Sequence, residues 1–463
     1  MASAPEDSPL QKLFATVFGA YLGLALLKFG NPPIMERFVA APTNMYEVVL
    51  GNPWPIKWAY VLLGAVVVSG VLAMRSNLGK RKRGPQEATR SKVFRWLVLS
   101  PLIWLVWQVI ATFKTVDGEL SGLTLAHFAS CVACFYLGFF VLSQVRDLKG
   151  FWLGLLCGFL LVLVVGWQQQ FGGLEETRQY FFTYIYPQLK VVSPDYIKKI
   201  SSNRIFSTLF YPNALAGALL LLLPISLGMI WQAQGRFTLG ARVFLLGVVG
   251  LAALGCLFWS GSKGGWLLMM MLGLITLLQL PLGQRFKIAI VAMVLVLGLA
   301  GFFWRYSGFF RKGATSVSAR FDYWQAAVKT TQANPVFGTG PGTFSIPYQQ
   351  IKRPESEMTR LVHNDYLEQA SDSGLPGFVA YAVFIFGSLA LTFRRFGQSV
   401  SDWPMFWIWL GVLGWAAQGF MEFGLYIPAL AWLAFAFLGL LVGRWGQRVP
   451  RTGDWQGTAD PVS

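Results

Sequence analysis

The chain has 463 residues, of which 55% are hydrophobic and only 13% are charged, and its mean hydropathy is +0.51. An ordinary soluble domain carries about 25% charged residues, so this composition excludes a typical soluble enzyme. The net charge of +17 would suit a nucleic-acid-binding protein, but the Lys and Arg residues concentrate in loops between apolar runs, where they set membrane topology. We therefore expect a membrane protein and no nucleic-acid partner.

Apolar runs of about 20 residues, each long enough to cross a bilayer core of about 30 Å, recur along the whole chain. They lie at about 12–29, 56–74, 95–113, 122–143, 151–167, 206–231, 243–259, 265–281, 287–304, 375–393, 404–420 and 427–443. This pattern predicts an all-α polytopic membrane protein with about twelve transmembrane helices. Lys28, at the end of the first run, would also fit a re-entrant or interfacial helix. The preceding MASAPEDSPLQK does not resemble a cleaved signal peptide.

Basic loops predict the orientation of these helices. Residues 75–95 contain eight Lys or Arg residues, and such a loop stays on the cytoplasmic side. Counting spans from it places both termini inside, together with the short loops at 144–150, 232–242, 282–287 and 394–403. The same count places 168–205 and 305–374 outside. We expect residues 1–463 to form one membrane domain whose two long external segments make a cap.

The fourth apolar run contains a CxxC pair, Cys131 and Cys134. No Asp, Glu or His completes a ligand set around them, so they fit small core residues better than a metal site. His127, at the mouth of the same run, has no polar neighbours in the sequence and is expected to be structural. No metal ion or cofactor is predicted.

The external segment 305–374 contains an amphipathic pattern. From Ser318 to Ala333, an apolar stripe of Phe321, Trp324 and Val328 predicts a helix lying on the membrane surface, and Asn334-Pro335 ends it. FGTGPGTF follows at 337–344. Without a preceding strand of a βαβ unit, this glycine-rich stretch fits a tight turn better than a backbone contact to a phosphate or sugar, although both interpretations stay open.

RLVHNDYLEQASDSGLPG, at 360–377, holds His363, one of only two histidines in the chain. Asn364 is a plausible N-cap of a short helix that Gly374-Leu375-Pro376 would end. The dipole at a helix N-terminus disfavours imidazolium and favours a neutral ring that can accept a proton. His363 is therefore a candidate general base, and the alternative is a hydrogen-bonded structural histidine.

Four further charged residues fall on the predicted outer side: Arg204, Lys263, Arg320 and Glu422. Several cations with one histidine and one carboxylate suit an anionic, lipid-linked substrate, although each cation could instead be a surface charge at the headgroups. An enzyme outside the cytoplasm has no nucleotide pool, so its donor must carry its own leaving group, such as a lipid pyrophosphate. Arg and Lys side chains would stabilise the departing pyrophosphate.

Four segments that carry these residues resemble, in order, those of the O-antigen ligase / O-antigen polymerase superfamily of bacterial inner-membrane proteins. They are NRIFSTLFYPNALAGALLLLLP (203–224), WSGSKGGWLLMMM (259–271), RFDYWQAAVKTTQANPVFGTGPGTF (320–344) and HNDYLEQASDSGLPGFVAY (363–381). Lys263 stands where the family's hallmark has Arg, and Gln418 stands where relatives often have His. These departures indicate a divergent branch.

The resemblance implies a metal-independent glycosyltransferase with a membrane-type (GT-C-like) fold and an external cap. It implies transfer of a glycan from undecaprenyl pyrophosphate to an acceptor hydroxyl, on lipid A core, a protein or the growing glycan, at the periplasmic face of the inner membrane. His363 would be the base. Arg204 and Arg320 would contact the pyrophosphate, and Lys263, Glu422 and Asn364 would also bind substrate.

Two alternatives to a ligase stay open at this stage. A polymerase of the same superfamily would extend the lipid-linked glycan itself, and the sequence does not separate it from a ligase. A transporter, as proposed for bicarbonate uptake by cyanobacterial relatives, is less well supported because the charged residues cluster in external loops rather than in mid-span, where ion coupling would favour them. A purely structural membrane partner is the remaining possibility.

Overall fold

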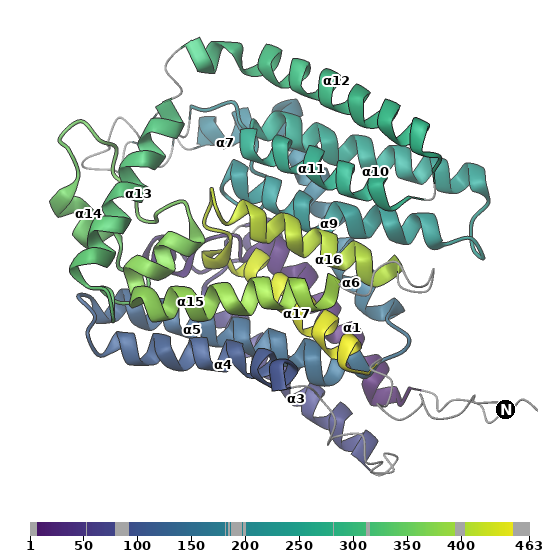
Figure 1. Ribbon diagram of the computed structural model, residues 1–463, viewed down its shortest axis with the longest axis horizontal. Helices are drawn as coiled ribbons and strands as arrows, with labels where there is room; N and C mark the ends of the chain where they lie inside the picture. Colours follow the sequence, from purple (N-terminus) through teal and green to yellow (C-terminus); the bar gives the residue numbers. More distant parts are fainter. Residues whose placement is uncertain are drawn as a thin grey trace, which may run out of the picture.

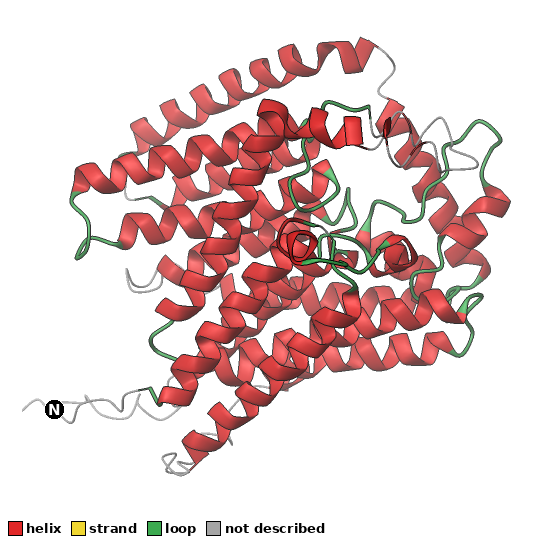
Figure 2. Cartoon of the chain, turned by 180° about the vertical axis from the view of Figure 1, so that it is seen from behind, coloured by secondary structure: helices red, strands yellow, loops and turns green. Residues whose placement is uncertain are grey.

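The computed structural model describes residues 7–51, 53–78, 92–180, 182–183, 186, 197, 201–280, 282–311, 315–393 and 403–447. Within these ranges all regular elements are helices (Figures 1 and 2). Ten are long and apolar enough to cross a membrane: α1 (Pro9–Lys28), α3 (Ile56–Leu78), α4 (Lys92–Thr112), α5 (Gly118–Tyr136), α6 (Lys149–Gln168), α9 (Pro212–Gln232), α10 (Leu239–Ser260), α12 (Gln284–Arg311), α15 (Asp365–Phe393) and α17 (Pro428–Gln447).

Each of the twelve predicted apolar runs corresponds to a helix, so the prediction of an all-α polytopic membrane protein is confirmed. The two that fall short of spanning length are α11 (Lys263–Gln279), with 17 residues, and α16 (Trp403–Gln418), with 16 residues. The first run forms the 20-residue helix α1, where the Nζ of Lys28 donates to the carbonyl oxygens of Val49 at 2.7 Å and Gly51 at 2.8 Å. These carbonyl groups provide hydrogen-bond acceptors for the charged ammonium group at the end of the run. Parts of the segment 168–205 and of the basic loops 75–95 and 394–403 lie outside the described residues.

Helices α1 and α6 cross at glycine residues, where their backbones approach closely. A Cβ added to Gly19 would lie 2.1 Å from the carbonyl oxygen of Phe151, and one added to Gly158 would lie 2.4 Å from that of Gly23. Small residues four positions apart let two helix backbones approach closely, which is a common way for membrane helices to gain packing contacts. Any larger residue at these positions would force the two helices apart.

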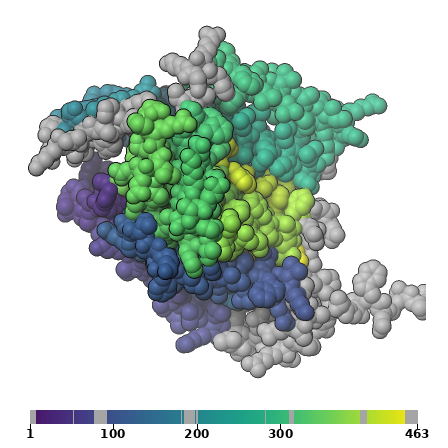
Figure 3. Space-filling model, turned by 60° about the vertical axis from the view of Figure 1, so that its left-hand side comes forward, coloured from purple at the N-terminus to yellow at the C-terminus, as the bar shows by residue number. Residues whose placement is uncertain are grey.

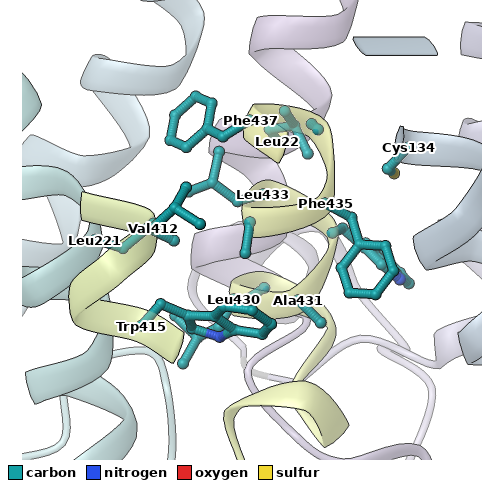
Figure 4. Close-up of a cluster of buried hydrophobic side chains, with 14 of the residues drawn as sticks. Leu22, Cys134, Leu221, Val412, Trp415, Leu430, Ala431, Leu433, Phe435 and Phe437 are labelled. Atoms are coloured by element: carbon teal, nitrogen blue, oxygen red, sulfur yellow. The ribbon is translucent and has the colours of Figure 1, made fainter. Parts of the chain in front are cut away.

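The centre of the bundle is α17. Its residues from Pro428 to Gly443 are all buried, including Leu433, Phe435 and Phe437 (Figure 4), as expected for a helix that is apolar all round. A glycine again permits close contact, since a Cβ on Gly439 would lie 2.0 Å from the carbonyl oxygen of Phe135 on α5. Helix α17 thus packs directly against the backbone of α5.

The cap lies at one end of the bundle, opposite the first residues of α1, and contains α13 (Thr315–Ala333) and α14 (Ser345–Ile351) (Figures 1 and 3). The predicted amphipathic helix is confirmed as α13, but its buried stripe is Tyr323, Ala326 and Ala327, which packs with residues of the chain after it. Phe321 and Val328 of the predicted stripe are 60% and 42% exposed. The cap's own packing decides which stripe is buried, and contact of the exposed stripe with a membrane stays a prediction.

The glycine-rich stretch forms a tight turn. Gly338, Gly340 and Gly342 all have positive φ, at 65°, 106° and 74°, a conformation that suits glycine. The amide of Gly340 donates to the carbonyl oxygen of Asp372 at 2.8 Å, and that of Gly342 donates to its carboxylate Oδ2 at 2.6 Å. The turn interpretation is therefore confirmed, because these amides hold α15 rather than point into an open space.

Helix α15 bends where the sequence predicted that a short helix ends. Ser373 and Gly374 have non-helical dihedrals, and Gly374 adopts φ 71°. The indole Nε1 of Trp107 donates to the freed carbonyl oxygen of Ser373 at 2.8 Å, and the amide of Leu375 donates to Pro335 at 2.8 Å. The segment before the bend belongs to the cap end, and the segment after it continues into the bundle.

Candidate functional site

Glu422 lies at the centre of the site, in the turn between α16 and the short helix η9 (Gly424–Tyr426). Its carboxylate Oε1 forms an ion pair with the Nη2 of Arg320 and accepts a hydrogen bond from the Nδ2 of Asn213 at 2.5 Å. Its Oε2 lies 3.1 Å from the Nδ1 of His363. One carboxylate thus joins residues from α9, α13 and the start of α15.

The local backbone explains why His363 reaches Glu422. The amide of Asp365 donates to the carbonyl oxygen of Gly419 at 2.7 Å, which ties the start of α15 to the turn that carries Glu422. His363 itself has φ 56°, a strained value for a residue with a side chain, and such strain clusters at functional sites. Its ring packs on Tyr323 and Phe423, with centroids 5.8 Å and 4.7 Å away.

Arg204 precedes α9, and two hydrogen bonds orient its guanidinium. The Nε donates to the carbonyl oxygen of Ser260 at 2.6 Å, and the Nη2 donates to the Oδ1 of Asn213 at 2.8 Å. The bond to Ser260 places Arg204 against the end of α10, beside the turn into α11. The guanidinium therefore lies next to Lys263 rather than in open solvent.

Lys263 opens α11, whose N-cap Ser262 accepts from the amide of Gly265 at 3.3 Å. The Nζ of Lys263 lies 5.1 Å from the ring centroid of Tyr306, on α12. A cation at a helix N-terminus is disfavoured by the helix dipole, whereas an anion there is stabilised. A lysine held at this position beside two arginines indicates a place for an anionic group.

Arg204, Lys263 and Arg320 line a cavity of about 60 Å³ with Glu422 and the glycines of the α10–α11 turn. Three cations face a single carboxylate there, so the lining carries excess positive charge. Burial alone would raise the pKa of the Glu422 carboxyl, but the hydrogen bond from His363 and the charges of Arg320 and Arg204 outweigh it and hold this pKa below its ordinary value. Glu422 is therefore anionic at neutral pH.

Asn364 is the N-cap of α15, as predicted. Its Oδ1 accepts from the amides of Tyr366 and Leu367, both at 3.0 Å, and its Nδ2 donates to the carbonyl oxygen of Phe420 at 3.0 Å. Both polar atoms are thus engaged within the protein. The cap role accounts for this residue, and its predicted contact with substrate stays a prediction.

The other histidine belongs to the core. His127 is fully buried, and its Nε2 lies 2.8 Å from the carbonyl oxygen of Leu425. Cys131 and Cys134 are free and fully buried in the same core. The structural interpretation of all three residues is confirmed.

Sequence reasoning missed a second polar cluster, formed by the carboxylates of Asp365, Glu368 and Asp372 on the first segment of α15. All three are at most 1% exposed. A backbone amide donates to each of them: Leu425 to Asp365 at 3.0 Å, Val362 to Glu368 at 3.1 Å, and Gly342 to Asp372 at 2.6 Å. Their i, i+3, i+7 spacing was a usable signal for one buried helix face.

Sequence reasoning also missed Asn213, although it lies in the Pro-Asn step of the first family-like segment. Its amide bridges Arg204 and Glu422. The structure thus brings together Arg204, Arg320, Glu422 and His363 near Asn213, and Lys263 lines the same cavity.

The fold and the site define a multi-pass helical membrane protein in which a histidine–carboxylate pair lies beside a cationic cavity. Residues 248–382 match the O-antigen ligase family. This match covers part of the chain and supports the resemblance to the O-antigen ligase / O-antigen polymerase superfamily that the motifs predicted. The matched range contains Lys263, Arg320 and His363, and it supports glycan transfer of the ligase or polymerase type.

A similar protein of Haemophilus influenzae, described only as an uncharacterized protein, is 28% identical over 184 residues. The match covers 35% of this chain and 45% of that relative. The chain therefore spans less than half of the relative's length. This similarity gives no information about the activity.

Proposed function

We propose that this protein transfers a glycan from an undecaprenyl-pyrophosphate-linked donor to an acceptor hydroxyl, at the periplasmic face of the bacterial inner membrane. The observation that carries the proposal is the His363–Glu422 pair, 3.1 Å apart, at the edge of a cavity lined by three cations. The loop charges support the orientation, because they place this end of the bundle outside.

His363 is the general base of the proposed reaction. The Glu422 carboxylate only accepts hydrogen bonds, so in the neutral form of His363 the hydrogen bond between them assigns the proton to Nδ1 and leaves the lone pair on Nε2. Nε2 can then take the proton of the acceptor hydroxyl as its oxygen attacks. Glu422 stabilises the imidazolium that forms.

The cationic cavity stabilises the leaving group. The bond between the anomeric carbon and the pyrophosphate oxygen breaks, the bond from the acceptor oxygen forms, and the electron pair leaves with the polyprenyl pyrophosphate. Arg204, Arg320 and Lys263 provide positive charge where negative charge develops, which lowers the barrier most in a site with little water. Lys263 acts as a point charge, because it lacks the fork of an arginine.

Polymerisation is the second candidate function, and it uses the same chemistry with the growing glycan as acceptor. The family match fits both equally. Lipid A core or a protein hydroxyl would make the enzyme a ligase. The two differ only in the acceptor, which the assay below distinguishes.

The test uses purified protein in proteoliposomes with a polyprenyl-pyrophosphate oligosaccharide and three separate acceptors: lipid A core, a hydroxyl-bearing peptide and a second donor molecule. We expect glycan transfer to one of them, and a loss of at least 100-fold in His363→Ala, the scale of general base catalysis. Lys329→Ala removes an exposed cation of α13 and should leave the rate unchanged. No transfer to any acceptor, or wild-type transfer by His363→Ala, would contradict the proposal.

A further inference from the structure

We propose that Asn213 is a positioning residue that holds the Glu422 carboxylate against His363 and keeps Arg204 facing the cavity. The catalytic consequence rests on the proposed function, whereas the positioning itself does not. Neither the composition nor the family-like motifs assign a role to this side chain. The argument comes from its two partners and from the way its backbone is held.

The two polar atoms of the Asn213 side-chain amide bind groups of opposite charge. Its Nδ2 donates to the carboxylate Oε1 of Glu422 at 2.5 Å, and its Oδ1 accepts from the guanidinium Nη2 of Arg204 at 2.8 Å. A flipped amide would set NH₂ against the guanidinium and oxygen against the carboxylate, so only one orientation satisfies both. Hydrogen bonds to charged partners are also the strong ones. The amide is thus fixed in the orientation that serves Glu422.

The backbone of Asn213 is fixed as well. The Nε2 of Gln418 donates to the Asn213 carbonyl oxygen at 2.8 Å, and the Gln418 carbonyl oxygen accepts from the amide of Glu422 at 3.0 Å. Gln418 is 3% exposed, and a Cβ on Gly217 would lie 2.4 Å from its Oε1. Space for Gln418 is therefore made by a glycine on α9. The start of α9 and the turn that carries Glu422 form one hydrogen-bonded unit.

The uncharged amide of Asn213 determines which charged groups pair with Glu422. Arg320 already forms an ion pair with Glu422. Arg204 lies close enough to interact with the same carboxylate, and it would also pair with Glu422 in the absence of Asn213. Such pairing would draw the carboxylate away from His363 and turn Arg204 away from the cavity. Asn213 prevents this second pairing because it supplies both Arg204 and Glu422 with a neutral partner. It thereby keeps Arg204 apart from the His363–Glu422 pair.

Transfer kinetics provide the first test. In Asn213→Ala we expect kcat to fall about 10- to 100-fold, as for the loss of one hydrogen bond to a charged group, and KM for the donor to rise because Arg204 is released. KM for the acceptor should stay unchanged. Asn44→Ala, which removes an exposed helix-capping asparagine, is the matched control and should not change kcat. Thermal unfolding verifies that each variant is folded.

Imidazole nitrogen NMR provides a readout that needs no activity. The chain has only two histidines, so protein labelled with ¹⁵N-histidine gives two ring patterns, of which one belongs to the buried His127. We expect the neutral ring of His363 to carry its proton on Nδ1 in the wild type and to become a mixture of tautomers in Asn213→Ala. In Asn213→Asp, the added carboxylate cannot donate to Glu422, and the ring pattern should change as well.

Unchanged ring patterns in both variants, or wild-type kcat in both, would overturn the inference. If the wild type transfers no glycan, the proposed function fails, while the ring patterns still decide whether Asn213 positions the pair. The two failures are therefore distinguishable in one set of samples.

Discussion

The chain contains two carboxylate clusters near the same end of the bundle, and they are built in opposite ways. Asp365, Glu368 and Asp372 are almost fully buried and are held by backbone amides and by the hydroxyl of Tyr426. Among their hydrogen-bond partners in the described part of the chain, none is a Lys or Arg. Glu422, in contrast, bonds an arginine and a histidine at the edge of a cavity.

This difference separates a structural cluster from a functional one. A buried carboxylate that receives neutral donors connects segments of backbone, here the glycine turn, the start of α15 and η9. The Glu422 carboxylate, in contrast, bonds both His363 and Arg320. It therefore influences the protonation of the histidine and the charge at the edge of the cavity. The comparison predicts that substitutions in the first cluster reduce stability and that substitutions at the second reduce turnover.

The largest effect is expected for Glu422→Gln. This change keeps the size of the side chain but removes the charge that orients His363 and stabilises its imidazolium. We expect kcat to fall about 100-fold, within the range for general acid–base catalysis, with a small change in unfolding temperature. Transfer assays in proteoliposomes measure the rate. A stability loss with wild-type turnover of the folded fraction would place Glu422 in the structural class.

The reciprocal change is Asp372→Ala. It leaves the amide of Gly342 and the hydroxyl of Tyr426 without their shared acceptor, and each orphaned buried donor costs about 1–3 kcal/mol. We expect the free energy of unfolding to fall by about 2–4 kcal/mol while kcat of the folded protein stays within about threefold. Denaturant unfolding measures the loss. Asp372→Asn retains an acceptor oxygen and should lose less, and a greater effect on kcat than on stability would break the comparison.

Lys263 tests the leaving-group side of the site. Lys263→Ala should raise KM for the donor about 10-fold, because it removes one charge from the cavity at a partly hydrated position. Lys263→Arg should bind the donor at least as well as wild type, because the fork matches phosphate geometry. Steady-state kinetics with varied donor concentration compare the three proteins. Equal KM values in all three proteins would show that Lys263 does not bind the donor.

A smaller effect is expected for the stability that Glu422 contributes as the pH is lowered. The pKa of Glu422 lies below its ordinary value of 4.5, so its interactions add stability fully above about pH 4.5 and lose it as the pH falls through the lower folded value. The difference in unfolding temperature between wild type and Glu422→Gln should stay constant from about pH 7 to 5 and shrink below 4.5. A difference that already shrinks between pH 7 and 5 would contradict the depressed pKa.

Local chemistry explains what could be predicted from the sequence. Apolar runs, the Asn364 cap and the bend at Gly374 depend on neighbouring residues, and all three predictions are confirmed. Arg204, Arg320, Glu422 and His363 could be grouped only through topology and family resemblance. Their roles remain proposals.

Long-range packing explains what could not be predicted. Asn213 and Glu422 are 209 positions apart, and no local pattern connects them. The side of α13 that packs inward could not be predicted either, because Tyr323, Ala326 and Ala327 pack with α14 and the chain before α15, whereas periodicity picked out only the stripe that contains Phe321. The burial of the carboxylates on the first segment of α15 likewise depends on the chain segments that pack around them.

The most direct measurement compares donor binding with turnover in two variants. Radiolabelled polyprenyl pyrophosphate and the glycan-bearing donor are offered to Arg204→Ala and His363→Ala in the same proteoliposomes. If the cavity binds the pyrophosphate and His363 accepts the proton, Arg204→Ala loses at least about 10-fold in binding, while His363→Ala binds like wild type and transfers no glycan. Transfer by His363→Ala at the wild-type rate, or unchanged binding by Arg204→Ala, would contradict this account.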